Sequence, residues 1–393
     1  MNPAQLVMQR CDALGKISEQ PGQLTRSFAS PAMRRANELV GAWMQEAGLE
    51  ARVDAAFNLL GGWHSARRGA KTLLLGSHLD TVRDAGKYDG PLGVLTAIAA
   101  VQFLRAQKVD LPFHLEIVGF SDEEGVRYQT TYLGSRAFAG TLTTADLARI
   151  EEKQIVKARR DKKDFLGYIE VHIEQGPVLE KYNLPVGVVT AIAGQSRLRV
   201  DFVGVAGHAG TVPMNLRRDA LAGAAEFISA VENFAKKKSG LVATVGKIEA
   251  TPGASNVIPG HVTLTLDVRD QNDLRRTAAV NALKIKAKSI AEKRGLKLNW
   301  LAVQQTNAVP CDAQAIKLFS ECIARRGLKL VKLPSGAGHD AVALSAICPV
   351  AMLFVRCKGG VSHNPAESVR TADVASAIGV LADFIQTLAA KYA

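Results

Sequence analysis

The hydrophobic pattern of this chain changes twice along its length, and these changes limit the folds that it can adopt. Over residues 1–188, short apolar runs such as 73–75 and 115–120 alternate with helical patterns such as 39–47 and 93–106. Strands that are apolar throughout and alternate with helices are typical of a largely parallel sheet covered by helices on both faces. The first part of the chain is therefore predicted to be an α/β domain.

The middle of the chain, residues 189–303, has a different pattern. Segments 198–203 and 262–268 alternate apolar and polar residues with a period of two, which is typical of antiparallel strands with one face in water. Two long helical patterns, 219–236 and 273–294, accompany these strands, and a glycine follows the second, as at many helix C-termini. We expect a small two-layer α+β domain.

The first pattern returns in residues 304–393. Segment 350–355 reads as a buried strand, and segment 373–389 reads as a closing helix. The simplest architecture is therefore one α/β domain, built from residues 1–188 and 304–393, which is interrupted by an inserted domain at 189–303.

Composition argues against two classes of partner. The net charge is +12, but the clearest basic runs, 157–163 and 236–238, have no interleaved aromatic residues, and aromatic residues make up only 6% of the chain. Base-stacking platforms are therefore scarce, and we expect a solvated basic surface that binds no nucleic acid. No uninterrupted apolar run reaches the length of a membrane span, so no membrane partner is expected.

The cysteines and the N-terminus suggest a cytoplasmic protein. The five cysteines are scattered and show no paired metal spacing, which predicts buried free thiols in a reducing compartment. The first residues lack a basic region followed by an apolar core, so no secretory signal is expected.

Residues with metal-binding chemistry follow the first buried strand. A glycine and a serine break the apolar run 72–75, so that His78 and Asp80 are expected at the C-terminal edge of a strand, with Asp89 close behind in the sequence. In open α/β sheets this edge is where ligands bind. Imidazole and carboxylate groups are the ligands of catalytic Zn²⁺ or Mn²⁺ when one position stays open to water.

Further clusters of the same chemistry occur along the chain. Glu123 and Glu124 follow another buried strand, and one of two adjacent glutamates can bind metal while the other stays available as a base. His172 and His363 each stand beside a glycine break, and His208 lies among glycines that allow close approach of a ligand. Each cluster by itself also fits a polar turn.

Taken together and in order, these segments resemble a known family. The segments are His78-x-Asp80, Asp89-Gly90, Glu123-Glu124-Gly125, His172-Ile-Glu-Gln-Gly, Gly207-His208-Ala209-Gly210, Ala254-Ser-Asn256-Val-Ile-Pro259-Gly260, Gly336-Ala-Gly338-His339-Asp340 and Ser362-His363. The family is that of the di-metal amidohydrolases, which includes allantoate amidohydrolase, N-carbamoyl-L-amino-acid hydrolase and β-ureidopropionase. It lies within the aminoacylase and carboxypeptidase superfamily.

The resemblance implies an α/β fold, a di-zinc exopeptidase-like catalytic domain with an inserted α+β lid and dimerisation domain. It implies a homodimer through that inserted domain and two divalent metal ions per subunit, Zn²⁺ or Mn²⁺ with Co²⁺ also suitable. The matching metal ligands are His78, Asp89, Glu124, His172 and His363. Glu123 would be the general base, Asp80 would orient His78, and His208 would act on the substrate, in the family from the partner subunit. The positions that match substrate-binding or neighbouring pocket residues are Gln175, Gln195, Asn256, Arg269 and His339.

The implied reaction is hydrolysis of a ureido or carbamoyl C–N bond in a small anionic substrate. Allantoate and N-carbamoyl-L-amino acids both fit, with release of ammonia and carbon dioxide, as in ureide and purine catabolism. A metal-dependent aminoacylase or dipeptidase on the same fold is the alternative, because it would use every metal ligand. A non-catalytic binding protein is a weaker alternative, since the ligand set is intact and Glu123 is present.

Overall fold

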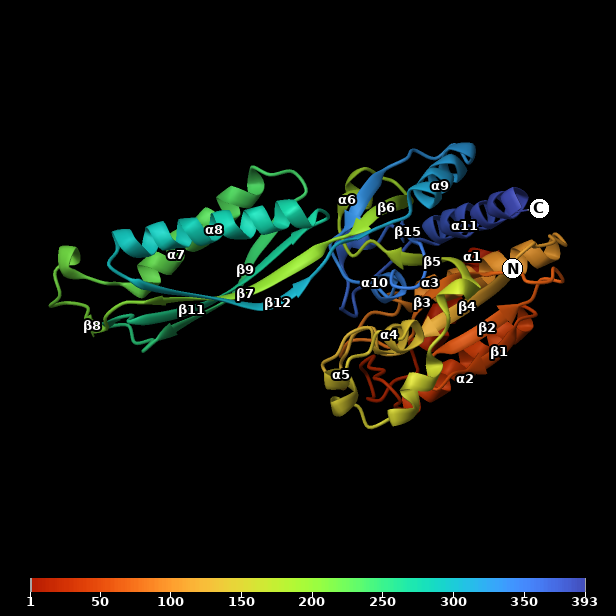
Figure 1. Ribbon diagram of the computed structural model, residues 1–393, viewed down its shortest axis with the longest axis horizontal. Helices are drawn as coiled ribbons and strands as arrows, with labels where there is room; N and C mark the ends of the chain where they lie inside the picture. The colour runs from red at the N-terminus through yellow and green to blue at the C-terminus, as the bar shows by residue number, and fades with distance from the viewer. Residues whose placement is uncertain (1, 393) are drawn as a thin grey trace. The chain divides into compact units, whose positions relative to one another are not determined.

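The computed structural model describes residues 2–392 and divides into two compact units (Figure 1). The larger unit consists of Met1–Thr190 and Pro310–Ala393, and the smaller unit is Ala191–Val309. The smaller unit is thus an insertion in the sequence of the larger one. Its roles as a lid and as a dimerisation domain stay predictions.

The larger unit is built on a mixed sheet whose strands follow the order β1-β2-β4-β3-β5-β15-β6-β13, with β14 beside β6. Its strands are β1 (Glu50–Val53), β2 (Leu59–Trp63), β3 (Thr72–His78), β4 (His114–Phe120), β5 (Phe165–Ile173), β6 (Val186–Ile192), β13 (Val309–Pro310), β14 (Lys332–Ser335) and β15 (Val350–Val355). The central strands β4, β3, β5 and β15 are parallel to one another, whereas β2 and β6 pair with them in antiparallel fashion. The mixed α/β class is therefore confirmed.

Helices cover this sheet on both faces. The longer helices are α1 (Pro3–Leu14), α2 (Pro31–Glu46), α3 (Pro91–Ala106), α9 (Ala313–Arg325) and α11 (Thr371–Tyr392). The shorter ones are α4 (Leu133–Ala139), α5 (Thr144–Arg149), α6 (Val178–Lys181) and α10 (Ala341–Leu344), with 3₁₀ turns at η1 (Lys153–Ala158), η2 (Lys162–Asp164) and η4 (Lys358–Gly360). Helices α1, α3 and α11 pack on one another, so the first and last helices are neighbours, and their apolar side chains share one core with the sheet (Figure 1).

The sequence predicted that Gly76 and Ser77 end the first buried strand, and this prediction is wrong. Gly76 and Ser77 do not end β3, which continues to His78. The strand is central and pairs with β4 and β5 along its length, so tertiary pairing outweighs the weak strand preference of glycine and serine. Ser77 is also anchored from the side, because its hydroxyl donates to Glu170 of β5 at 3.1 Å. His78 still lies at the C-terminal end of the strand.

One helix among residues 2–392 is long and apolar enough to cross a membrane by length and composition alone, namely α11. Asp373 and Asp383 fall within it, so its sequence contains no uninterrupted apolar run of that length. However, 56% of its apolar stretch is buried inside the larger unit, as in the core helix of a globular domain.

The smaller unit is a sheet covered by two helices. Its sheet follows the order β12-β7-β11-β9, and a short ribbon pairs β8 with β10. The elements are β7 (Gly194–Val203), β8 (Gly207–His208), η3 (Met214–Leu216), α7 (Ala220–Lys236), β9 (Val242–Thr251), β10 (Val257–Ile258), β11 (His261–Asp270), α8 (Asp273–Lys293) and β12 (Lys297–Thr306). All pairs in the sheet are antiparallel, as the period of two predicts.

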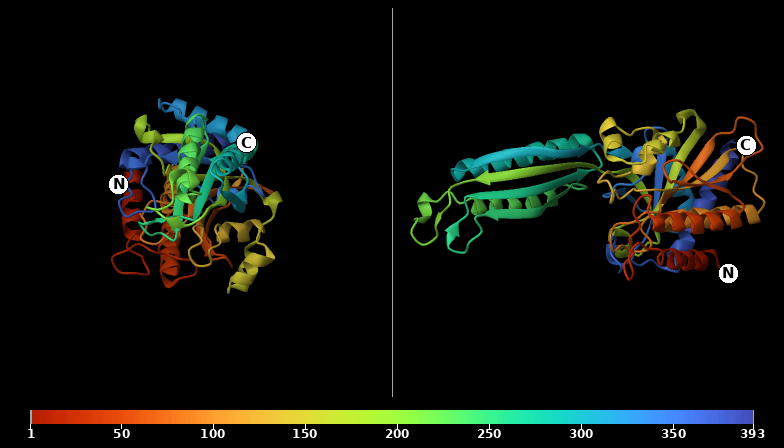
Figure 2. Two further views of the ribbon diagram at one scale, coloured as in Figure 1. Left: turned by 90° about the vertical axis from the view of Figure 1, so that its left-hand side faces the viewer. Right: turned by 90° about the horizontal axis from the view of Figure 1, so that it is seen from below.

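The alternation in β7 separates the two faces of this sheet. Leu198, Val200 and Phe202 are buried against α7 and α8, whereas Arg197 and Arg199 point to the other face and are exposed. Figure 1 and the further views in Figure 2 show both helices on that one face. The other face carries the polar side chains named below.

Candidate metal centre

Two histidines end neighbouring strands with the same hydrogen-bond pattern. His78 and His172 lie in β3 and β5, and both are 2% exposed. Nδ1 of His78 is 3.1 Å from the backbone carbonyl oxygen of Asp80, and Nδ1 of His172 is 2.9 Å from that of Ile173. A carbonyl oxygen only accepts, so each Nδ1 donates to it, and Nε2 is the atom left for a metal ion.

Asp89 lies at the centre of the cluster. Its Oδ1 atom is 3.0 Å from Nε2 of His172 and 3.6 Å from Nε2 of His78. Its Oδ2 atom is 3.0 Å from Nε2 of His363, which itself lies 3.2 Å from Oε1 of Glu124. Asp89 thus belongs both to the group with His78 and His172 and to the group with Glu124 and His363, and the ligand atoms of each group lie within 4.8 Å of one another. Two-metal hydrolytic sites share a ligand in this way.

The charges in the cluster suit a cation. Burial raises the pKa of Asp89, but hydrogen bonds from His172, His363 and His78 outweigh burial and hold the pKa well below its usual value. Burial lowers the pKa of His78, but Asp80 and Asp89 outweigh it, and the pKa stands well above its usual value. A divalent cation would replace the protons that these imidazoles carry, which is the exchange that metal binding to histidine requires.

Asp80 positions the two adjacent glutamates. Its Oδ1 atom accepts a hydrogen bond from the backbone N–H of Glu123 at 3.0 Å, and its Oδ2 atom accepts one from Glu124 at 3.1 Å. Burial raises the pKa of Glu123 well above its usual value, against the opposing charge of His78. A buried carboxyl group with a raised pKa beside a metal cluster has the properties of a general base.

His363 and Gln175 reach the cluster from strained backbone. Each has a φ of 56°, in the left-handed region that non-glycine residues seldom adopt and that often marks functional sites. Nε2 of Gln175 donates to Oδ2 of Asp89 at 3.0 Å and to the hydroxyl of Ser362 at 2.9 Å, and Ser362 donates to the same Oδ2 at 2.7 Å. The structure therefore places Gln175 against Asp89, while its expected substrate contact stays a prediction.

His339 lies behind the cluster. It is 1% exposed, its Nε2 atom is 2.7 Å from the hydroxyl of Ser335, and its ring centroid lies 4.6 Å from that of His172. Burial lowers its pKa well below the usual value, with the charge of His172 acting in the same direction. His339 is thus a neutral imidazole packed against a candidate ligand, and the substrate contact expected for it stays a prediction.

Gln195 and Arg269 lie opposite each other in the smaller unit, in the paired strands β7 and β11. Both bond to Asp267: Gln195 donates to Oδ2 at 2.5 Å, and Arg269 donates from Nε to Oδ1 and from Nη2 to Oδ2, each at 3.0 Å. Asp267 therefore fixes the plane of the guanidinium group. Sequence reasoning missed Asp267, because a polar residue on the wet face of a strand carries no special local signal.

His208 and Asn256 lie together, beside the end of this sheet that is opposite to Gln195 and Arg269. The residue after His208 donates its N–H to the carbonyl oxygen of Asn256 at 2.9 Å, and both side chains are exposed. They adjoin the end of β11 that begins at His261 (Figure 1). At a rise of about 3.4 Å per residue, the stretch from His261 to Arg269 spans roughly 27 Å. The four expected substrate residues therefore lie in two separate places in the smaller unit: Gln195 and Arg269 at one end of the sheet, and His208 and Asn256 beside the other.

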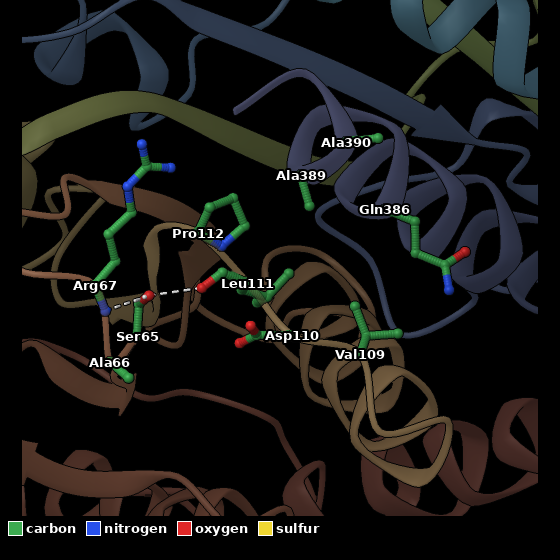
Figure 3. A pocket seen from close by; sticks show the side chains of 10 residues that line it. All are labelled: Ser65, Ala66, Arg67, Val109, Asp110, Leu111, Pro112, Gln386, Ala389 and Ala390. Carbon is green, nitrogen blue, oxygen red and sulfur yellow. Dashed lines mark hydrogen bonds between the residues drawn. The ribbon is translucent and has the colours of Figure 1, made fainter. Parts of the chain in front are cut away.

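A separate pocket in the larger unit lies away from the cluster (Figure 3). It adjoins the start of β4 and the end of β2, whereas the candidate ligands His78 and His172 lie at the C-terminal ends of β3 and β5. Ser65 donates to the carbonyl oxygen of Leu111 at 2.6 Å and accepts from the N–H of Arg67 at 3.2 Å. Within the described part of the chain, none of the possible metal-ligand groups lines this pocket. It is not part of the candidate centre.

Comparison with known proteins identifies the family of this chain. The sequence model of peptidase family M20/M25/M40 matches residues 74–387. Allantoate deiminase 1 of Glycine max is 42% identical, over 95% of this chain and 87% of the relative. The N-carbamoyl-L-amino acid amidohydrolase of Geobacillus stearothermophilus is 39% identical, over 97% of both chains. The crystal structure of an amidase of the hydantoinase/carbamoylase family from Burkholderia multivorans superposes with a TM-score of 0.92, at 29% identity and over 98% of both chains.

The mixed α/β fold and the cluster around Asp89 define a hydrolase whose larger unit offers ligands for metal ions. The chain belongs to peptidase family M20/M25/M40. The family resemblance seen in the sequence is confirmed, as is the enzyme class.

Proposed function

We propose that this enzyme hydrolyses the C–N bond of a ureido or carbamoyl group in a small anionic substrate, either allantoate or an N-carbamoyl-L-amino acid. The single observation that carries the proposal is the set of imidazoles and carboxylates around Asp89, with the separate carboxyl group of Glu123 beside it. The relatives named for allantoate and for N-carbamoyl-L-amino acids support the choice of substrate class.

The buried free cysteines fit a reducing compartment, and we propose that the enzyme is cytoplasmic.

The donor set fits two divalent metal ions. His78 and His172 would hold one ion, Glu124 and His363 the other, and Asp89 would reach both. Mixed imidazole and carboxylate ligands suit Zn²⁺, Mn²⁺ and Co²⁺. When bound, such ions lower the pKa of water and polarise a carbonyl oxygen.

Glu123 is the proposed general base. It takes the proton of the attacking water and returns it to the leaving nitrogen, and Asp80 holds its backbone in place for both transfers. The products are ammonia, carbon dioxide and an acid that carries an amine.

The carboxylate of the substrate is proposed to bind to Arg269, with Gln195 beside it. The guanidinium group offers a planar pair of donors that matches a carboxylate, a match that lysine makes poorly. Asp267 supports this role because it fixes Arg269 and Gln195 on one face of the smaller unit.

We propose that the active site is shared in a homodimer. His208 and Asn256 lie roughly 27 Å along the sheet from Arg269, so one rigid smaller unit is poorly suited to bring both ends to one metal pair. In the proposed dimer, Gln195 and Arg269 of one smaller unit act at one metal centre, and His208 and Asn256 of the same unit act at the other. His208 would stabilise the negative charge that develops on the carbonyl oxygen.

A substrate panel tests the proposal. Ammonia release is measured from allantoate, N-carbamoyl-L-amino acids and N-carbamoyl-β-alanine, after loading with Zn²⁺ or Mn²⁺. Release of amino acids from an N-acetyl amino acid and from a dipeptide is measured in parallel. Turnover confined to the ureido and carbamoyl compounds supports the proposal, whereas preference for the N-acetyl compound or the dipeptide would establish the aminoacylase or dipeptidase alternative.

A further inference from the structure

Glu367 lies close behind Asp89 and bonds to its backbone. Its Oε2 atom accepts hydrogen bonds from the N–H groups of Tyr88 at 2.7 Å and Asp89 at 3.0 Å. The side chain is buried, with the whole residue 4% exposed. Glu367 follows His363 in the same loop, and its own N–H donates to the carbonyl oxygen of Asn364 at 3.0 Å. One side chain thus joins the loop that carries His363 to the loop that carries Asp89.

Gly86 provides the space that Glu367 occupies. A Cβ atom at position 86 would lie 2.4 Å from Cβ, Cδ and Oε2 of Glu367, far inside van der Waals contact. Gly90 packs on the other side in a similar way, because a Cβ there would lie 2.5 Å from the ring of His78. The loop around Asp89 is therefore held between Glu367 and His78.

We propose that Glu367 is a positioning residue for the metal centre, which sets Asp89 and His363 at the separation that two metal ions require. This inference rests on the proposed roles of Asp89 and His363 as metal ligands. The carboxylate acts as a hydrogen-bond acceptor for the Asp89 loop, and Gly86 is the residue that allows it to do so. Loss of a partner of this kind commonly costs about 10–100-fold in metal affinity or activity.

Metal affinity of the metal-free, full-length protein tests the proposal by titration with Co²⁺ against a chelator, with the Co²⁺ absorption spectrum as a second readout. Glu367→Ala is expected to weaken binding of both ions by about 10–100-fold, because Asp89 serves both. Glu367→Gln keeps an acceptor oxygen and is expected to stay close to wild type. An equal loss in both variants would overturn the role of Glu367 as a hydrogen-bond acceptor.

Gly86→Ala provides an independent test from the other side of the contact. It is expected to mimic Glu367→Ala, since it displaces the same carboxylate. In a Glu367→Gly background, which removes the clashing Cβ as well, the change at position 86 should add little further loss, as expected for two residues that act through one contact. Additive losses would overturn the proposal.

Asp312→Ala is the matched control. Asp312 also accepts a backbone N–H, that of Ala315 at 2.8 Å at the start of α9, but it lies at the opposite end of β15 from the cluster. This variant should lower the melting temperature and leave metal affinity unchanged. If wild type binds no divalent metal, the proposed function fails. If wild type binds metal and the variants at positions 367 and 86 bind it equally well, only the present inference fails.

Discussion

Oδ2 of Asp89 lies 3.0 Å from Nε2 of His363, although the whole of the smaller unit separates the two residues in the sequence. The other carboxylate oxygen of Asp89 faces His172 and His78. Asp89 therefore joins ligands from both sequence segments of the larger unit, and most of the testable chemistry of this enzyme depends on it.

The two halves of the metal centre are expected to respond differently to substitution. Asp89→Asn should weaken binding of both ions, because each carboxylate oxygen faces a different group of ligands. Glu124→Gln should lower the metal content from about two ions per subunit to about one, since Oε1 of Glu124 lies 3.2 Å from Nε2 of His363, the proposed ligand of the second ion. Metal analysis after dialysis measures both, with the exposed Asp110→Asn as a control. Equal metal loss in both ligand variants would contradict the shared role of Asp89.

Glu123→Gln is expected to keep the fold and the metal but to lose activity. The amide cannot accept the proton of water, and removal of a general base commonly costs about 10²–10⁴-fold in turnover. The measurement is kcat together with metal content and melting temperature. Turnover close to wild type would mean that another group is the base.

Arg269→Lys is expected to reduce kcat/KM for substrates that carry a carboxylate. Hydrogen bonds to a charged group contribute about 1.5–3 kcal/mol, so the loss should be roughly 10–100-fold. An N-carbamoyl amine without a carboxylate serves as the control substrate, and its hydrolysis should change little. Equal losses for both substrates would assign Arg269 a structural role instead.

Mixing two inactive variants tests whether the active site is shared between subunits. His208→Ala and Glu123→Gln are combined under conditions that exchange subunits, and each mixed dimer then contains one site with both residues intact. Activity should recover to about a quarter of wild type, since about half of the dimers are mixed and each has one good site of two. An absence of recovery despite demonstrated exchange would place His208 outside the partner's site.

The cysteines should resist thiol reagents in the folded enzyme. Burial raises the pKa of Cys311 and Cys348 to about 12 and that of Cys357 to about 11, so little reactive thiolate exists near pH 8. Unfolding returns the thiols to a pKa near 8.5 and exposes them, so reaction with a chromogenic disulfide should become fast in denaturant. A thiol that reacts quickly in the native state would contradict this.

Local patterns were enough to predict the elements that carry the candidate site. The strand at 350–355 and the helix at 93–106 agree closely with β15 and α3, because period and composition report burial directly. The glycine after the second long helix of the smaller unit, Gly295, has a φ of 64°, as its position after that helix predicts. Element ends were less well predicted: α2 begins at Pro31, well before the predicted helical pattern at 39–47, because Ser30 caps it.

By itself the sequence determined the chemistry that the chain can offer. Residues that lie near one another in the chain determine the types of candidate ligands, their order, and the alternation of strands and helices. Only the tertiary structure decided how these groups meet. It placed Gln175 against Asp89, buried His339 behind His172, and brought in Asp267 and Glu367, which no motif had marked. The reason is physical: a hydrogen bond between segments far apart in the chain leaves no periodic trace in either one, so it becomes visible only when the fold brings them together.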